Sequence, residues 1–202
     1  MTPSEQGNLS MREARDRYFR DNGFGPDGGY ASPWVELRLG PVPLPFPNTA
    51  ARKKAVPLHD LHHIVTGYAT DWRGEAEISA WEIGAGCGAM VVAWQLNLSM
   101  MLVGTAIAPR RTFRAFVRGR RSRSFYRAAY EPLLASTVRE AQALAEVPAT
   151  APAPRMSDAV LFGASLLGGL VAFVSTGALL VPLAPFGILA GVLAKRQVGA
   201  KA

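Results

Sequence analysis

The C-terminal part of the chain most restricts how this sequence can fold, because residues 159–194 contain no charged side chain. A helix needs about 20 apolar residues to cross the hydrocarbon core of a bilayer, and residues 159–181 meet that length. Pro182 and Pro185 then interrupt the apolar run. The remainder, 186–194, is short for a second crossing, so it either completes an inserted hairpin or ends one tilted span. We therefore predict that 159–194 is a transmembrane or membrane-inserted segment.

The rest of the chain is long enough for one domain with a hydrophobic core. Glycine and proline dominate residues 23–55, where the sequence WVELRLGPVPLPFPN permits at most a small hairpin that turns at Gly40-Pro41. The proline- and alanine-rich sequence VPATAPAP marks a linker before the apolar segment. We predict a helical metal-binding domain over 1–146 that includes this irregular segment, a linker over 147–158, and the membrane segment after it.

Helical patterns account for most of the predicted domain and place the chain in the mainly α class. The predicted helices span roughly 10–21, 56–66, 71–83, 86–107, 110–120 and 124–146. Ser10 is a suitable N-cap for the first helix, and Asn22-Gly23 a suitable end. Residues 84–108 also lack charge and are a second candidate span by length alone. Polar side chains within them favour the alternative, a central helix buried by its neighbours or by a lipid-like ligand.

All three histidines of the chain, His59, His62 and His63, lie within five positions. Successive residues of an α-helix are rotated by about 100°, so His59, Asp60 and His63 share one arc of the helix surface. His62 points about 160° away from Asp60. One cation therefore has two candidate ligand sets: His59, Asp60 and His63, or the three histidines. The second set lacks a carboxylate to balance the charge.

A carboxylate downstream can join this site if the chain reverses direction. Gly67 and the sequence GYAT allow a turn, so that a second helix begins near Asp71 and returns Glu75 to the histidines. Asp71 itself is a candidate cap or a hydrogen-bond partner of a ligand. Two imidazoles and two carboxylates suit zinc, and also iron or manganese. The predicted ligands of a divalent metal, zinc first, are His59, Asp60, His63 and Glu75.

Several familiar functions are excluded or disfavoured by the residues present. The zinc-protease motif HExxH needs a glutamate where Asp60 stands. Membrane desaturases need several histidine boxes, and this chain has three histidines in all. Cys87 is the only cysteine, which excludes an intramolecular disulfide and fits a reducing compartment. The polar N-terminus lacks the apolar core of a secretory signal, so we expect the domain in the cytoplasm.

Much of the formal net charge of +7 comes from eight arginines within eighteen residues. They are Arg110, Arg111, Arg114, Arg118, Arg120, Arg121, Arg123 and Arg127. Such a run forms a solvated face, or attracts anionic lipid or nucleic-acid phosphates. The flanking apolar stretches favour lipid, and the sequence has no nucleic-acid-binding motif. We predict contact with membrane lipids and none with nucleic acid.

The motif His59-Asp60-x-x-His63, followed after eleven residues by Glu75, resembles the signature of the coenzyme Q biosynthesis protein 4 family. The similarity is specific over residues 57–83, where Thr66-Gly67, Thr70-Asp71 and Gly74-Glu75 also match. It becomes vague toward 146. The resemblance implies a mostly helical, membrane-peripheral protein of ubiquinone biosynthesis. It also implies a metal, usually called zinc, held by His59, Asp60, His63 and Glu75.

The resemblance further implies removal of the ring carboxyl at C1 of a polyprenylated hydroxybenzoate-type intermediate, with hydroxylation of that carbon. We expect such an enzyme on the cytoplasmic face of a membrane, the inner membrane if the host is bacterial. Its partners would be the polyprenylated quinone precursor, membrane lipids and other enzymes of quinone biosynthesis. No catalytic residue beyond the metal site is predicted. The alternatives are a non-catalytic lipid-binding scaffold with a structural metal, and a metallohydrolase with a membrane anchor.

Overall fold

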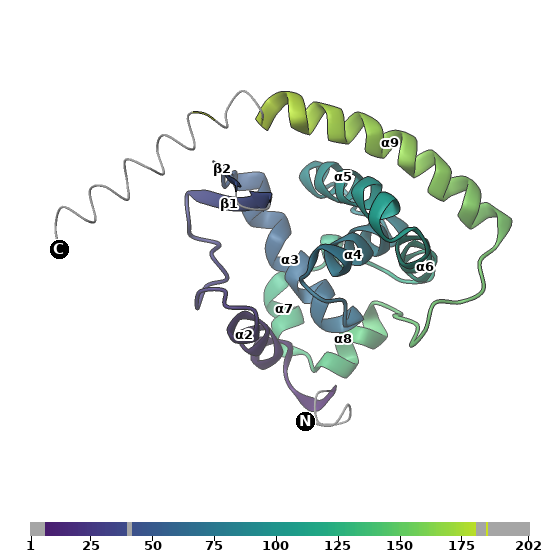
Figure 1. Cartoon of the computed structure of the whole chain (residues 1–202). Helices are drawn as coiled ribbons and strands as arrows, with labels where there is room; N and C mark the ends of the chain where they lie inside the picture. The colour runs from purple at the N-terminus through teal and green to yellow at the C-terminus, as the bar shows by residue number, and fades with distance from the viewer. Residues whose placement is uncertain (1–6, 40–41, 181–184, 186–202) are drawn as a thin grey trace.

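The structure, a computed structural model, describes residues 7–39, 42–180 and 185 (Figure 1). Within these residues the protein is mainly helical with one two-stranded sheet, which confirms the predicted fold class. The elements are α2 (Met11–Asp21), β1 (Trp34–Leu39), β2 (Val42–Pro47), α3 (Ala50–Thr66), α4 (Trp72–Ala85), α5 (Val91–Ile107), α6 (Pro109–Gly119), the 3-10 turn η1 (Phe125–Arg127), α7 (Tyr130–Ala135), α8 (Val138–Leu144) and α9 (Met156–Leu180).

The N-terminal elements follow the local signals of the sequence. Ser10 caps α2, and its side chain and that of Glu13 form a reciprocal capping box. The helix ends at Asp21, with Asn22 as the C-cap. The hairpin that the sequence permits is present, since β1 and β2 pair antiparallel from Trp34 opposite Pro47 to Leu39 opposite Val42. Its predicted turn at Gly40-Pro41 lies outside the described residues. A two-stranded sheet tolerates the prolines of β2 because its outer edges need no hydrogen-bond partner.

Two predicted helices have different bounds in the structure. Helix α3 begins at Ala50, inside the segment predicted to be irregular, because the side chain of Thr49 caps it by accepting from the backbone N–H of Arg52. Pro57 lies within this helix without ending it. Helix α5 begins at Val91 instead of 86, because Gly86 and Gly88 adopt positive φ angles of 89° and 55°, which helical residues do not.

The prediction of one helix over 124–146 was wrong. This region forms the separate elements η1, α7 and α8. Pro132 sits in the first turn of α7, where its missing N–H costs little. Ser136 and Thr137 are both extended, and Thr137 starts α8 with a capping box that includes Glu140. The cap at Thr137 therefore ends the helical pattern of α7 and begins a new helix, α8.

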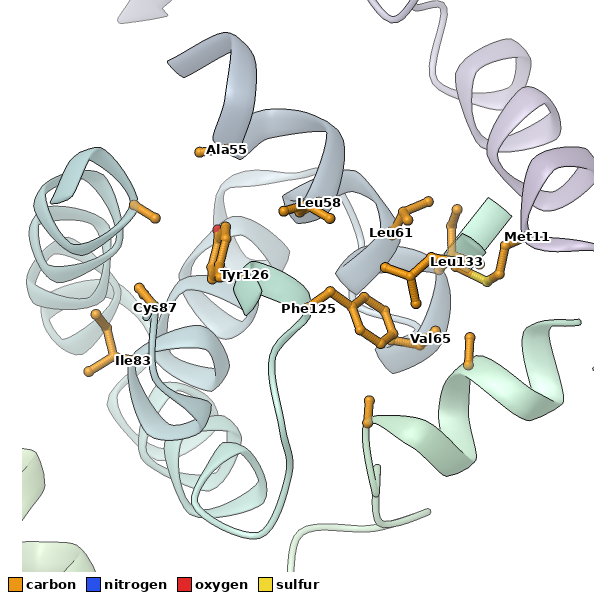
Figure 2. Packing of buried hydrophobic residues seen from close by; sticks show 14 of the residues in the cluster. Met11, Ala55, Leu58, Leu61, Val65, Ile83, Cys87, Phe125, Tyr126 and Leu133 are labelled. Atoms are coloured by element: carbon orange, nitrogen blue, oxygen red, sulfur yellow. The ribbon is translucent and has the colours of Figure 1, made fainter. Parts of the chain in front are cut away.

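Helix α3 runs through the core of the described fold, since residues 60–66 are all buried. Figure 2 shows Leu61 and Val65 of α3 in one cluster with Phe125 and Met11. This cluster draws on α2, α3, η1, α7 and α8. The histidine-bearing turns of α3 therefore lie where packing holds them on several sides.

Helix α4 packs closely against both α5 and α6. A Cβ atom on Gly119 of α6 would lie 2.0 Å from the carbonyl oxygen of Trp81, and one on Gly84 would lie 2.4 Å from that of Phe116. The backbones of α4 and α6 thus touch directly, with no room for a side chain between them. Because α4 also carries Glu75, this contact fixes the position of one predicted ligand.

Helix α9 starts at Met156, within the predicted linker, and lies along α5 (Figure 1). Its Phe162 ring contacts Phe113 and Phe116 of α6, with centroids 5.1 and 5.3 Å away. The amide of Gln95 on α5 donates to the carbonyl of Ala172. These contacts join the apolar helix to the domain along its length.

The outer face of α9 is apolar and exposed. It carries Met156, Val160, Leu161, Leu167, Leu170, Val171, Phe173 and Val174. Over Met156–Ala178, 23 residues, α9 is long and apolar enough to cross or anchor in a membrane. Among the described residues α5 is a shorter apolar helix of 17 residues. The second part of the predicted membrane segment, after 180, lies outside the described residues except for position 185.

Candidate metal centre

The turn between α3 and α4 forms from the residues that the sequence indicated. Gly67 ends α3 with a left-handed φ of 75°, and its N–H donates to the carbonyl of His63. Asp71 is the N-cap of α4, where its side chain accepts from the N–H of Gly74 at 2.7 Å. The turn therefore places the first turn of α4 beside the last turns of α3.

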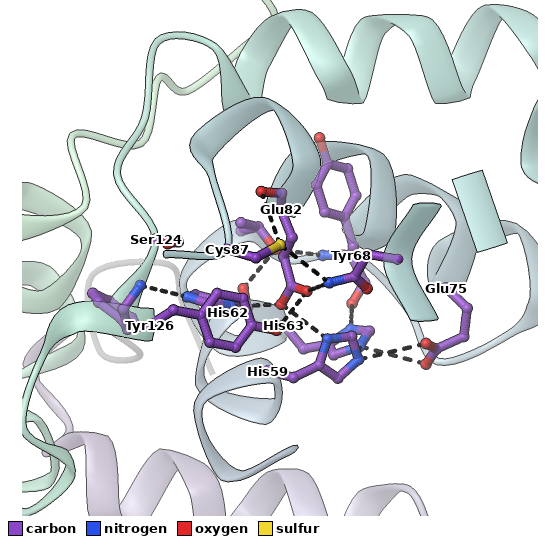
Figure 3. Close-up of polar contacts among 12 residues, drawn as sticks. His59, His62, His63, Tyr68, Glu75, Glu82, Cys87, Ser124 and Tyr126 are labelled. Carbon is purple, nitrogen blue, oxygen red and sulfur yellow. Dashed lines mark hydrogen bonds and ion pairs between the residues drawn. The ribbon is translucent and has the colours of Figure 1, made fainter. Parts of the chain in front are cut away.

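Three of the four predicted ligands meet at this turn. One ligand atom from each of His59, His63 and Glu75 can be chosen so that all lie within 4.8 Å of one another. The two Nε2 atoms are 3.2 Å apart, and the Glu75 oxygens lie 3.6 Å from Nε2 of His59 and 3.4 Å from Nε2 of His63. Figure 3 shows both imidazoles facing the Glu75 carboxylate. These residues form a histidine–glutamate cluster that could hold a metal ion.

The other nitrogen of each imidazole determines which tautomer is present. Nδ1 of His59 lies 2.9 Å from Oε1 of Glu82, and Nδ1 of His63 lies 3.0 Å from the carbonyl oxygen of Tyr68. Both partners accept hydrogen bonds, so both Nδ1 atoms carry a proton. The two Nε2 atoms then face each other and Glu75, and if neither of them carries a proton, their lone pairs point at one another. Such an arrangement is repulsive unless a proton or a cation lies between them.

Asp60, the fourth predicted ligand, is not one of the three clustered residues. Its Oδ2 accepts a short hydrogen bond from the hydroxyl of Tyr30. Burial raises the pKa of Asp60, while the nearby His59 and the Tyr30 hydrogen bond act in the opposite direction. Asp60 therefore lies close enough to affect the cluster electrostatically, but a tyrosine from outside α3 holds one of its oxygens.

His62 points to the other side of α3 and is fully buried. Its Nδ1 lies 2.6 Å from Oε1 of Glu82, and its Nε2 accepts from the backbone N–H of Phe125 at 2.7 Å. Its ring packs against those of Trp81, Phe125 and Tyr126. Burial lowers the pKa of His62, which keeps the ring neutral. Both of its nitrogens are thus engaged, and the structure does not bring the three histidines together as one ligand set.

Glu82 is a buried residue in contact with the histidines that the sequence did not indicate. Its side chain is 0% exposed, and it accepts from His59, His62, Asn97 and Tyr126. Burial alone would raise the pKa of Glu82, but His59 and His62 outweigh that effect and hold it well below its usual value. Two signals could have found it. Glu82 is the only charged residue over 78–108, and it follows Glu75 by seven positions, about two helical turns, on the same face.

The charges of this site favour a bound cation. Burial would raise the pKa of Glu75, but the hydrogen bonds with His59 and His63 lower it to about 2. Glu75 and Glu82 are therefore both ionised near neutral pH. Burial acts to lower the pKa of His59, but Glu82 and Glu75 raise it well above its usual value. In the absence of a metal, a proton on His59 would offset part of the negative charge.

The cluster is open on the Glu75 side. The Glu75 side chain is 35% exposed and that of His59 is 20% exposed, whereas that of His63 is 1% exposed. The ring of Tyr18 stacks on His63, with centroids 5.6 Å apart and planes 26° apart. One side of the cluster is therefore covered by α2, and another is accessible from solvent.

Several residues of the predicted arginine face are engaged within the protein. Arg111 pairs with Glu77, Arg121 with Asp158 on α9, and Arg123 with Glu146. Arg118 donates to the carbonyl oxygens of Thr66 and Pro148 and lies over the Tyr68 ring. Arg120 also lies near Asp158, with Nε 3.7 Å from Oδ1. Six of the eight arginines are exposed to solvent, namely Arg110, Arg111, Arg114, Arg120, Arg123 and Arg127.

No protein-family model, curated protein or solved structure matches the chain, so the family resemblance stays a prediction.

Proposed function

We propose that this protein is a membrane-associated, metal-dependent enzyme of ubiquinone biosynthesis. In this proposal it removes the C1 carboxyl group of a polyprenylated hydroxybenzoate and hydroxylates that carbon. The main support is the cluster of His59, His63 and Glu75, in which two imidazole lone pairs and a carboxylate converge at an accessible position. This donor set suits zinc, iron or manganese. The identity of the pathway rests on the family resemblance of the motif.

The spacing of the donor atoms agrees with a single metal ion. Two nitrogens 3.2 Å apart, each about 2.0–2.1 Å from an ion, subtend an angle of about 100° at that ion. This value lies between those of octahedral and tetrahedral coordination. A divalent cation would also offset the charges of Glu75 and Glu82 while both histidines stay neutral.

The number of clustered ligands favours an enzyme over a structural metal site. Structural zinc sites are closed by four protein ligands, whereas catalytic sites have three and leave a position for water or substrate. Here three residues converge, while Tyr30 holds the Asp60 carboxylate. A bound metal would anchor the ring carboxylate and stabilise the charge that develops as CO₂ leaves. Hydroxylation also needs dioxygen and a two-electron donor, so iron suits the complete reaction better than zinc.

The apolar face of α9 supports the membrane association. Met156, Val160, Leu167, Val171 and Val174 recur at helical spacing along the exposed side of the helix. A polyprenylated substrate stays in the bilayer, so an enzyme that lies at the membrane surface meets it there. The lone Cys87 agrees with a domain on the cytoplasmic side.

Release of CO₂ tests the catalytic proposal directly. The full-length protein, purified in lipid nanodiscs and loaded with Fe²⁺, Mn²⁺ or Zn²⁺, is supplied with a polyprenyl hydroxybenzoate labelled at the carboxyl carbon, with dioxygen and a reductant. We expect labelled CO₂ from the wild type and none above background from Glu75→Gln. Glu77→Gln, two positions away on α4 and paired with Arg111, is the matched control and should retain activity. Tight metal binding without CO₂ release would instead support the scaffold alternative.

A vesicle-binding assay tests the membrane proposal. Replacement of Leu167, Leu170 and Val174 by Asn removes three exposed apolar side chains from α9, each worth about 1.5–3 kcal/mol when fully buried in an apolar phase. We expect binding to phospholipid vesicles to weaken at least about tenfold, since about 1.4 kcal/mol suffices for that factor. A control variant in which the exposed residues Val91 and Leu144 are replaced by Asn should bind vesicles nearly as well as the wild type. Equal losses in both variants would contradict a specific role of α9.

A further inference from the structure

We infer that Glu82 is a positioning residue of the metal centre. Glu82 holds the His59 ring in the orientation in which Nε2 of His59 faces His63 and Glu75. The inference rests on the metal site of the proposed function and identifies what orients one of its ligands. Glu82 touches neither His63 nor Glu75 in any contact that the described residues show. It acts through Nδ1 of His59, 2.9 Å from its Oε1.

The Glu82 carboxylate is itself held from several directions. Oε1 accepts from His59 and His62 on α3, and Oε2 accepts from the Asn97 amide on α5 and from the Tyr126 hydroxyl on η1. A carboxylate has about four acceptor positions, so these contacts account for all of them. Glu82 therefore has no free lone pair for a metal, and its effect on the centre is indirect.

His62 completes this arrangement from the side away from the cluster. The N–H of Phe125 donates to its Nε2, which requires that its Nδ1 carry the proton that Oε1 of Glu82 accepts. The tautomer of His62 is thus set by the backbone of η1, and His62 in turn helps to set the position of Glu82. His62, which is not part of the cluster, therefore helps to hold His59, which is, in position.

The two clustered histidines differ in the partner of Nδ1. His63 donates to the neutral carbonyl of Tyr68, whereas His59 donates to an ionised, buried carboxylate. A carboxylate draws the proton of Nδ1 more strongly, and so makes Nε2 a stronger electron donor to a metal. Burial of an isolated carboxylate is also costly unless it is fully hydrogen-bonded. Its position directly behind His59 gives this buried charge a role that an apolar side chain could not provide.

Zinc affinity, measured by competition with a chromophoric chelator, tests this role on the full-length protein. We expect Glu82→Gln to weaken zinc binding about 10–100-fold, the loss typical for a residue that hydrogen-bonds a ligand. Glu77→Gln removes the same charge from the same helix without touching the cluster, and should change the affinity less than about threefold. Tyr126→Phe removes one donor to Oε2 but keeps the contact with His59, so its effect should be smaller than that of Glu82→Gln.

Histidine ¹⁵N NMR of the zinc-loaded wild type provides a second test that needs no Glu82 variant. Because the chain has three histidines, each imidazole can be assigned from single His→Gln variants. We expect a proton on Nδ1 of His59, facing Glu82, and zinc on its Nε2. An Nδ1-bound zinc at His59 in the wild type would overturn the inference even if Glu82→Gln does not fold.

The outcomes also separate this inference from the proposed function. Tight zinc binding that Glu82→Gln leaves within threefold of the wild type would overturn the positioning role alone. Absence of CO₂ release, with the expected effect of Glu82→Gln on zinc, would overturn the catalytic proposal alone. A wild type that binds none of zinc, iron and manganese would overturn both.

Discussion

Glu75→Gln is expected to weaken zinc binding by more than about 100-fold, because it removes a direct ligand. Loss of a residue that only hydrogen-bonds a ligand typically weakens binding about 10–100-fold. Glu75 is 35% exposed, so the substitution should leave the fold intact. His63→Gln should give a similar loss, since it removes one of the two converging Nε2 donors. Equilibrium competition with a chelator measures both, with circular dichroism as the check on folding.

Asp60→Asn is the informative comparison for this first prediction. Tyr30 holds Oδ2 of Asp60, and Asp60 is not one of the three clustered residues, so we expect a loss of less than about tenfold. A loss as large as that of Glu75→Gln would show that Asp60 is a fourth ligand. The site would then be closed in the manner of structural zinc sites, which would favour the scaffold alternative over an enzyme.

His62→Ala is expected to lower the free energy of unfolding by about 3–5 kcal/mol, as large-to-small core substitutions do. The substitution leaves the Phe125 N–H without its acceptor, removes one donor to Glu82 and opens a cavity among three aromatic rings. Chemical denaturation of the metal-free protein measures the change. At low temperature the folded variant should still bind zinc, because the ligands of the cluster remain.

His59→Ala is the matched control for the second prediction. His59 is 20% exposed and makes no contact with a buried backbone N–H in the described structure, so its loss should cost less stability than that of His62. For zinc affinity we expect the opposite order: His59→Ala should bind zinc much more weakly than His62→Ala does. Equal effects of the two substitutions on both properties would contradict the separate placement of these histidines.

The sequence predicted those parts of the site that depend on the geometry of one helix or one turn. The rotation per residue placed His62 about 160° from Asp60 and left two candidate ligand sets open. Gly67 with Asp71 marked the turn that returns Glu75. The partners from distant segments could not be predicted in this way. Tyr30 reaches Asp60 from the segment before the hairpin, and the acceptor for the Phe125 N–H is set by tertiary packing.

The same distinction applies to the fold. Ser10 was predicted correctly as the N-cap of α2, and the hairpin is the structure that the proline-rich segment was expected at most to form. The helical pattern over 124–146 predicts one helix, but the cap at Thr137 begins a separate helix within it. Apolar composition showed that α9 is suited to a membrane, but it contains no information on which helix of the domain α9 packs against.

The direct contact of backbones at Gly84 and Gly119 determines which part of the centre can move. Helices that touch without intervening side chains cannot slide past each other unless their main chains separate, so α4 and α6 behave as one rigid block. Glu75 and Glu82 belong to that block. On another side of the cluster, the ring of Tyr18 on α2 stacks on His63. The α4–α6 pair is thus the fixed frame of this centre, and it carries both of the carboxylates that face His59.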